Sequence, residues 1–460
     1  MDKARIAELS VTDRANVFHP STHLAQFARG EAPNRIITKA EGIYIEDAEG
    51  VRSLDGFSGL YCVNVGYGRK EIADAIAEQA STLAYFHAYV GHSHEPVIKL
   101  SERIVRKAGM GMQRVYYGMS GSDANETNIK LVWYYNNVLG RPEKKKIISR
   151  QRGYHGSGIM TGSLTGLGLF QDHFDLPVNV IKHTMCPHQY WNGMDGETEE
   201  EFSQRCADEL EKMIIAEGPD TVAAFIGEPI LGTGGIIPPP AGYWQAIQKV
   251  LDKYDVLLIA DEVITGFGRT GQYFGSHTYG MKPDLIAIAK GLTSAYLPLS
   301  GVIVGERVWK VLEQGTDEFG AIGHGWTYSA HPICAAAGNA NLDIVDKEDL
   351  PANAREVGGY FQQKLHATFG DHPMVGEVRG VGLMAALEFV ADKEKKERFD
   401  PSKKVGYSVA GACLEEGLIA RAMPHGEILG FAPPLIVTKD DIDTIVAKAK
   451  TAVDKVYAAL

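Results

Sequence analysis

Residues that can do acid, base or covalent chemistry follow several short apolar segments in the middle of the chain. Lys290 is the least ordinary of them, because a lysine at the end of a buried strand must find a partner or lose its charge. Others have a simpler explanation when each is taken alone: Asp261 could be a turn residue, and Ser120 could cap a helix. The whole set is far more specific, and it comprises Ser120, Gly121, Ser122, Tyr154, Glu228, Asp261 and Lys290.

The chemistry that uses all of these groups at once is that of pyridoxal phosphate, which needs a lysine, an acid at its pyridine nitrogen and a cup for its phosphate. We expect Lys290 to form the Schiff base and move the proton, and Asp261 to keep the pyridine nitrogen protonated. Tyr154 is expected to stack on one face of the ring and Val263 to pack on the other. Free backbone N–H groups at a helix N-terminus would hold the phosphate. These groups belong to Gly121 and Ser122.

The elements that must position these residues show an α/β pattern, in which short apolar runs alternate with helical stretches between about residues 110 and 305. The runs do not alternate apolar with polar residues, as expected for strands covered on both faces of a largely parallel sheet. Ligands bind such sheets at the carboxyl ends of the strands, so the chemical residues should meet at one edge. The predicted strands are 114–117, 146–149, 222–226, 256–260, 285–289 and 301–304, with helices at 125–139 and 243–254.

The two ends of the chain have a different pattern. Residues 42–45 and 50–55 indicate a short antiparallel meander, and a long helical stretch begins near residue 331. Strands are predicted within 377–389 and 418–436. We therefore expect a large domain over 61–330 and a smaller one built from 1–60 and 331–460.

The chain resembles the class III (omega) aminotransferases, pyridoxal phosphate enzymes of fold type I, over nearly its full length. The matching stretches are GLYCVNVGYG (59–68), SGSDANET (120–127), GYHGS (153–157), GEPI (227–230), DEVITGFGRT (261–270), AKG (289–291), GWTYS (325–329) and APP (432–434). The resemblance implies a mostly parallel seven-stranded sheet between helices in the large domain and an α+β smaller domain. It also implies a homodimer, or a tetramer, with active sites at the interface. In such an active site, Glu228 would support the residues near Asp261, and Thr327 of the partner chain would bind the phosphate.

Arg421 matches the mobile arginine with which amine:pyruvate and taurine:pyruvate members hold the carboxylate of the acceptor. A two-pronged cation suits a carboxylate, although a surface arginine is the simpler explanation. The resemblance therefore implies an amine or ω-amino acid donor, pyruvate as acceptor and alanine as product. Tyr61 stands where several relatives carry tryptophan, and Tyr89 and Thr233 are expected to line the same pocket unless they only pack. Tyr154 is expected to contact the substrate as well as the cofactor ring. Such hydroxyl groups favour a polar donor such as taurine, β-alanine or a polyamine.

Composition excludes several partners. The net charge is −12 without a long basic run, which disfavours nucleic acid and anionic membranes. Five scattered cysteines, no CxxC pair and no secretory h-region indicate a cytoplasmic protein without disulfides or zinc. His87, His92, His94 and Glu95 lack a spacing that would gather them as metal ligands, so no metal is expected.

Other functions remain as alternatives. The same cofactor could serve a decarboxylase or an aminomutase, and a relative with this fold could be non-catalytic. A nicotinamide dehydrogenase would need a dinucleotide loop, and residues 266–271 spell GxGxxG. That stretch is separated from its strand and is followed by aromatic, turn-rich sequence, which disfavours the dehydrogenase.

Overall fold

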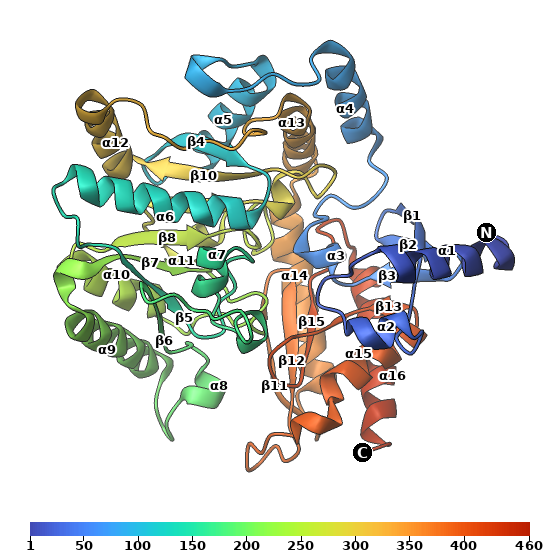
Figure 1. The fold of residues 1–460 in the computed structure, drawn as a ribbon. Helices are drawn as coiled ribbons and strands as arrows, with labels where there is room; N and C mark the ends of the chain where they lie inside the picture. Colours follow the sequence, from blue (N-terminus) through green and yellow to red (C-terminus); the bar gives the residue numbers. More distant parts are fainter.

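A seven-stranded sheet forms the centre of the larger part of the molecule in the computed structural model, which describes residues 1–460 (Figure 1). Its strand order is β4-β10-β9-β8-β7-β5-β6. Neighbouring strands run parallel except at β10, which is antiparallel to both β9 and β4. The strands are β4 (Met112–Gly118), β5 (Lys146–Arg150), β6 (Ile181–Thr184), β7 (Val222–Gly227), β8 (Leu257–Asp261), β9 (Leu285–Ile288) and β10 (Ser300–Gly305).

The six strands predicted from apolar runs are confirmed, with shifts of one or two residues at their ends. Every residue of β7, β8, β9 and β10 is buried, which is why these strands lack a polar face. The seven strands implied by the resemblance are confirmed, but the sequence pattern does not locate the seventh, β6. It lies at the edge of the sheet, and the half-buried Lys182 and His183 interrupt its apolar pattern.

Helices cover both faces of this sheet. On one face α6 (Gly121–Val138), α7 (Ile159–Leu164) and α12 (Glu306–Phe319) share a core with alternate strand residues. On the other face the core is shared with α5 (Glu95–Ala108), α9 (Glu199–Glu217), α10 (Tyr243–Lys253) and α13 (Pro332–Lys347). The predicted helices at 125–139 and 243–254 correspond to α6 and α10.

Two four-stranded sheets make up the rest of the fold and bring the chain ends together (Figure 1). The first has the order β1 (Ile37–Glu41), β2 (Tyr44–Asp47), β3 (Arg52–Asp55) and β13 (Leu418–Ile419), with Leu418 paired to Leu54. The second has the order β11 (Val375–Val381), β12 (Met384–Phe389), β15 (Ile428–Phe431) and β14 (Arg421–Ala422). Both termini therefore contribute to this part, as expected, and the predicted stretch 418–436 is three short strands. The domain boundaries at 60/61 and 330/331 stay predictions.

The remaining helices surround these sheets. α14 (Leu350–Phe369), α15 (Val405–Glu415) and α16 (Lys439–Tyr457) share one core with the smaller sheets. None of the helices combines the length and the apolar composition needed to cross a membrane. The other helices are α1 (Lys3–Asn16), α2 (Leu24–Ala28), α3 (Ser58–Tyr61), α4 (Lys70–Thr82), α8 (Gln189–Asn192) and α11 (Gly275–Tyr279).

Candidate active site

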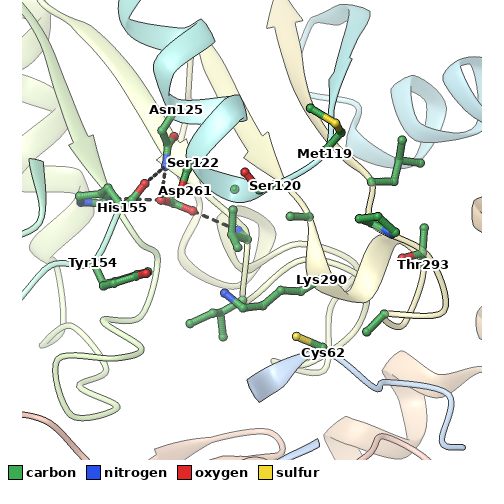
Figure 2. Close-up of a pocket in the computed structure, with 18 of the residues that line it drawn as sticks. Cys62, Met119, Ser120, Ser122, Asn125, Tyr154, His155, Asp261, Lys290 and Thr293 are labelled. Atoms are coloured by element: carbon green, nitrogen blue, oxygen red, sulfur yellow. Dashed lines mark hydrogen bonds and ion pairs between the residues drawn. The ribbon is translucent and has the colours of Figure 1, made fainter. Parts of the chain in front are cut away.

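A cavity of about 410 Å³ lies where the large-sheet strands end at their carboxyl side (Figure 2). That volume is within the range of small-ligand sites. Seven of the predicted site residues line it, and Lys290 is the only cationic residue among all that do. The seven are Gly121, Ser122, Tyr154, Glu228, Asp261, Val263 and Lys290.

Asp261 is the last residue of β8, and its buried carboxylate is held by three donors (Figure 2). Oδ2 accepts from Nδ2 of Asn125 and lies 2.8 Å from Nδ1 of His155, while Oδ1 accepts the backbone N–H of Val263 at 3.1 Å. The Asn125 bond is also 2.8 Å long. Nε2 of His155 is buried without a partner. The carboxylate is therefore fixed at the cavity wall and can face a positively charged ring nitrogen.

Lys290 follows β9 and opens a single 3-10 turn, Lys290–Leu292. Its φ of 45° lies in the left-handed region, which non-glycine residues adopt at some cost. The Nζ amine makes no hydrogen bond and no ion pair with the protein. Burial lowers the pKa of the Lys290 amine, and the charge of Arg421 lowers it as well. Such an amine is more often neutral, and so more nucleophilic, than an ordinary lysine.

Glu228 follows β7 and connects two loops beneath the cavity. Its Oε1 accepts the backbone N–H of Tyr154 at 3.0 Å, and its Oε2 accepts that of Gly232 at 2.7 Å. Burial raises the pKa of this carboxyl. The bond to Tyr154 fixes the backbone from which the ring of Tyr154 reaches the cavity, where that ring also contacts Phe170 edge-on.

The N-terminus of α6 has a capping box and, in addition, two backbone N–H groups without a protein acceptor. Ser120 and Asp123 form a capping box, as the simpler explanation predicted. The next two backbone N–H groups, of Gly121 and Ser122, donate to no protein acceptor. A Cβ on Gly121 would lie 3.1 Å from Val263, so glycine lets Val263 approach the helix. The capping box and an anion-binding helix end are therefore compatible here.

These residues fit pyridoxal phosphate. A partnerless lysine, a fixed carboxylate and two free N–H groups at a helix N-terminus face one cavity, and these are the groups the cofactor requires. Lys290 would hold the cofactor covalently, Asp261 would face its ring nitrogen, and the start of α6 would receive its phosphate. Tyr154 and Val263 lie among the lining residues as candidates for the two ring faces.

Of the residues expected to contact the substrate, Tyr154 lines this cavity, and the other four do not. Tyr61 and Thr233 are buried beside it, and Oη of Tyr61 donates to the carbonyl of Gly232 at 3.4 Å. Tyr89 is 42% exposed. Arg421 lies on β14 with its guanidinium 5.5 Å from the ring centre of Phe57 and without any hydrogen bond or ion pair. Their substrate roles stay predictions.

Thr327 also lies outside the cavity of its own chain. Thr327 is exposed, and its backbone carbonyl accepts a 2.6 Å hydrogen bond from Oη of Tyr85. A role toward the partner's cofactor stays a prediction.

Sequence reasoning assigned no role to three residues of the site. Asn125 and His155 hold Asp261, and Cys62 lines the cavity (Figure 2). All three lie inside stretches that match the family. Their roles depend on contacts between distant segments, which spacing does not reveal.

The GxGxxG stretch and the histidines near residue 90 have ordinary structural roles. Residues 266–271 form turns, and no helix follows until α11 begins at Gly275. His94 caps α5, since its Nδ1 accepts the N–H of Val97 at 3.3 Å.

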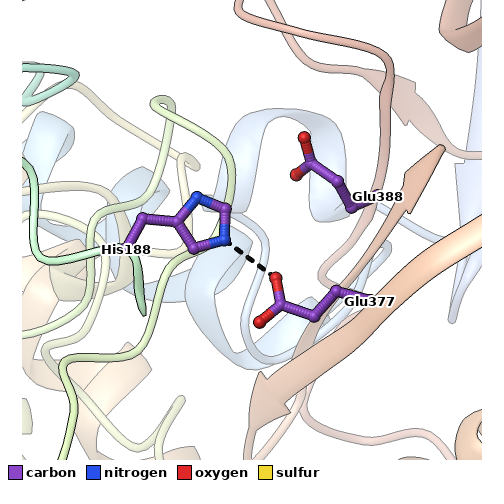
Figure 3. A group of neighbouring side chains, drawn as sticks. All are labelled: His188, Glu377 and Glu388. Atoms are coloured by element: carbon purple, nitrogen blue, oxygen red, sulfur yellow. Dashed lines mark hydrogen bonds and ion pairs between the residues drawn. The ribbon is translucent and has the colours of Figure 1, made fainter. Parts of the chain in front are cut away.

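A buried cluster elsewhere gathers potential ligand atoms from His188, Glu377 and Glu388 (Figure 3). Nε2 of His188 lies 2.8 Å from Glu377. Nη1 of Arg379 lies 2.6 Å from Glu377 and 2.8 Å from Glu388, so a guanidinium already forms ion pairs with both carboxylates. The cluster is an ion network between the loop before α8 and the sheet of β11 and β12.

Comparison with known proteins gives consistent matches. The family model "Aminotransferase class-III" matches residues 26–453. The chain is 65% identical to the diaminobutyrate–2-oxoglutarate transaminase of Halomonas elongata, over 97% of this chain and 96% of that protein. It is 43% identical to the putrescine–pyruvate aminotransferase of Pseudomonas aeruginosa, over 99% and 98%. The omega transaminase of Pseudomonas jessenii in complex with PMP superposes with a TM-score of 0.95 at 42% identity, covering 98% of each chain.

Proposed function

Since the chain belongs to the class III aminotransferases, which use pyridoxal phosphate, we propose that it transfers the amino group of an amine or ω-amino acid to pyruvate and so forms alanine. The observation that carries the acceptor assignment is the free guanidinium of Arg421. It makes no hydrogen bond or ion pair with the protein, and its charge adds to the effect of burial in lowering the pKa of the Lys290 amine.

Bound pyridoxal phosphate supplies an electron sink that stabilises negative charge on the carbon bearing the amine. Lys290 then moves the proton at that carbon, a task for which its lowered pKa suits it. Three donors hold the carboxylate of Asp261 in the position from which it would face the ring nitrogen. Glu228 fixes the backbone of Tyr154 and with it one wall of the cavity.

The charges around the cavity favour a monocarboxylate acceptor. A dicarboxylate such as 2-oxoglutarate needs a second cation for its distal group. The buried arginines nearby are held in place by the protein: Arg150 donates to the carbonyl of Glu228, Arg152 to that of Gly234, and Arg379 pairs with Glu377 and Glu388. Within one chain, Arg421 is thus the free cation for a single carboxylate.

The donor is proposed to be polar. Tyr61 and Thr233 bring hydroxyl groups next to the cavity, and Tyr89 is exposed and free to contact a donor. The relatives named for diaminobutyrate and putrescine support this, because both of those donors carry a second polar group. We place diamines and ω-amino acids before bulky aryl amines.

A second candidate acceptor is 2-oxoglutarate. The Halomonas elongata relative at 65% identity is named for that acceptor, whereas the Pseudomonas aeruginosa relative at 43% is named for pyruvate. This candidate requires a second cation, which would have to come from movement of a buried arginine or from another chain.

A matched screen of donors and acceptors tests the proposal. Purified enzyme with its cofactor is given putrescine, diaminobutyrate, β-alanine, taurine or an aryl amine, each with pyruvate or 2-oxoglutarate. We expect alanine in equimolar amount to the polar donor consumed. Glutamate formation without alanine would assign the second acceptor. Carbon dioxide release, or conversion without any keto acid, would contradict transamination in favour of a decarboxylase or an aminomutase.

We further propose that two copies share each active site, as class III enzymes are typically dimeric. Exposed aromatic side chains lie next to Thr327, since Tyr85 donates to its carbonyl and contacts Tyr328 edge-on; Phe86 and Tyr89, near Tyr85 in sequence, are exposed as well. Co-expression of Lys290→Ala and Thr327→Ala chains tests this. In a shared site the mixed dimer regains one intact site and the tight cofactor binding that Thr327→Ala weakens. Mixed dimers no better than the Thr327→Ala protein would contradict it.

A further inference from the structure

A short segment beside the cavity, residues 58–64, has an unusual backbone; we call it the active-site segment. Ser58, Gly59 and Tyr61 all have positive φ, at 49°, 64° and 62°. Such conformations cost free energy for residues other than glycine and persist only where the surroundings enforce them. This segment carries Cys62, which lines the cavity, and Tyr61. Something in the structure must therefore hold it.

The side chain of Arg269 holds both ends of this segment. It is fully buried, and its Nη2 donates to Oγ of Ser58 at 3.3 Å and to Oδ1 of Asn64 at 2.7 Å. Its Nη1 donates to the carbonyls of Leu383 and Pro433, at 3.1 and 2.8 Å. No carboxylate pairs with it. A single guanidinium thus joins the large sheet's loop 262–274, the active-site segment and the smaller sheets.

The contact continues to the catalytic lysine through Asn64. Nδ2 of Asn64 donates to the carbonyl of Phe267 at 3.3 Å, and its backbone carbonyl accepts from Leu435 at 2.8 Å. A Cβ on Gly291, the residue after Lys290, would lie 2.4 Å from Nδ2 of Asn64. Asn64 is therefore packed directly against the Lys290 turn.

We propose that Arg269 is a positioning residue, which holds the active-site segment against the Lys290 turn and ties both to the smaller sheets. This gives the GFGRTG stretch a role: it presents a buried arginine in place of a dinucleotide loop. Burying a guanidinium without a counter-carboxylate is costly, and burial lowers the pKa of Arg269 to about 10, so it stays charged at neutral pH. The planar guanidinium donates to four acceptors through two nitrogens that point in different directions, and a lysine ammonium cannot reproduce this geometry.

Cys62 provides the readout, because it is the only one of the five cysteines that is not buried. The rate at which iodoacetamide alkylates Cys62 in the cofactor-loaded enzyme is measured by mass spectrometry of its peptide. For Arg269→Lys we expect this rate to rise about tenfold, since loss of two or more hydrogen bonds allows the segment to open. We expect kcat/KM for the donor to fall about tenfold at unchanged cofactor content.

Arg379→Lys is the matched control. It also alters a buried arginine that joins the large sheet's loops to the smaller sheets, but it does not contact residues 58–64. We expect it to lower the melting temperature and to leave the Cys62 rate within twofold of wild type. If both variants speed the labelling equally, the effect is general loosening and the proposal is overturned.

Two further outcomes keep the proposal testable. If Arg269→Lys does not fold, Ser58→Ala removes one acceptor of Arg269 and should speed labelling about threefold. An unchanged Cys62 rate in either folded variant overturns the proposal. The kinetic measurement rests on the proposed function, whereas the labelling does not. If the variants are labelled faster but the wild-type enzyme makes no alanine from any donor, only the proposed function is refuted.

Discussion

The two halves of the active site are built differently. The cofactor half comes from one edge of the large sheet, and its acidic groups are buried and fully held: Asp261 by three donors and Glu228 by two. The proposed substrate half comes from the chain ends and from loops outside the large sheet. There Arg421 has no hydrogen bond, and Tyr89 is substantially exposed.

The difference separates two kinds of support. Groups that must keep a fixed geometry toward the ring lie on strands whose every residue is buried. The groups proposed to contact substrates lie on short strands and turns and make few hydrogen bonds. Mutations in the first half should therefore affect turnover with every substrate, and mutations in the second half should discriminate between substrates.

Lys290→Ala should have the largest effect of all. Without an amine to move the proton, turnover is expected to fall by about 10⁴-fold for every donor and acceptor. Alanine formation measures this. Lys144→Ala is the matched control, because Lys144 is a buried lysine that only donates to the carbonyl of Tyr254. It should lose stability and keep its turnover. Retained transfer in Lys290→Ala would remove Lys290 from its role.

Asp261→Asn should follow, with turnover lower by about 100- to 1000-fold for all substrates alike. The amide has the shape of the carboxylate but lacks its charge toward the ring nitrogen. Asp284→Asn is the control, since Asp284 lies at the opposite end of the strands and accepts from the N–H of Leu258. An equal loss in both variants, seen in steady-state kinetics, would mean that any carboxylate loss in this sheet impairs the fold.

Arg421→Ala should separate the two halves of the site. The KM for pyruvate is expected to rise by about 10- to 100-fold, the value of a charge-assisted hydrogen-bonded pair. The single-turnover rate with an uncharged amine should change little. Arg421→Lys should fall between wild type and alanine, because it keeps the charge but loses the fork. Equal losses with keto acid and amine would place Arg421 in the fixed half instead.

The pH dependence of Lys290 should give the smallest effect. Burial lowers its pKa from 10.5, so the neutral amine predominates from a lower pH than in a free lysine. When pyridoxal phosphate is added to cofactor-free enzyme, the rate of covalent attachment should rise with pH and level off below pH 10.5. N-acetyl-lysine in the same buffers is the reference. A plateau at the same pH for both amines would contradict a buried, neutral Lys290.

The cofactor half was readable from the sequence because its strands are uniformly apolar and each ends directly at a chemical residue. The roles of Asp261 and Lys290 were predicted in this way. Their supports were not, since the bonds from Asn125 and His155 to Asp261 join segments that only folding brings together. Likewise, β6 escaped prediction because an edge strand tolerates polar residues. The substrate half depends on turns with unusual backbone, which a sequence pattern does not specify.

The pairing of β13 with β3 has a consequence for the order of synthesis. Until Leu418 and Ile419 leave the ribosome, β3 is the open edge of the N-terminal meander, while the strands of the large sheet are already complete. An open strand edge invites association with other chains. We therefore expect truncated chains that end before residue 418 to aggregate, even though they contain Asp261, Lys290 and the whole large sheet.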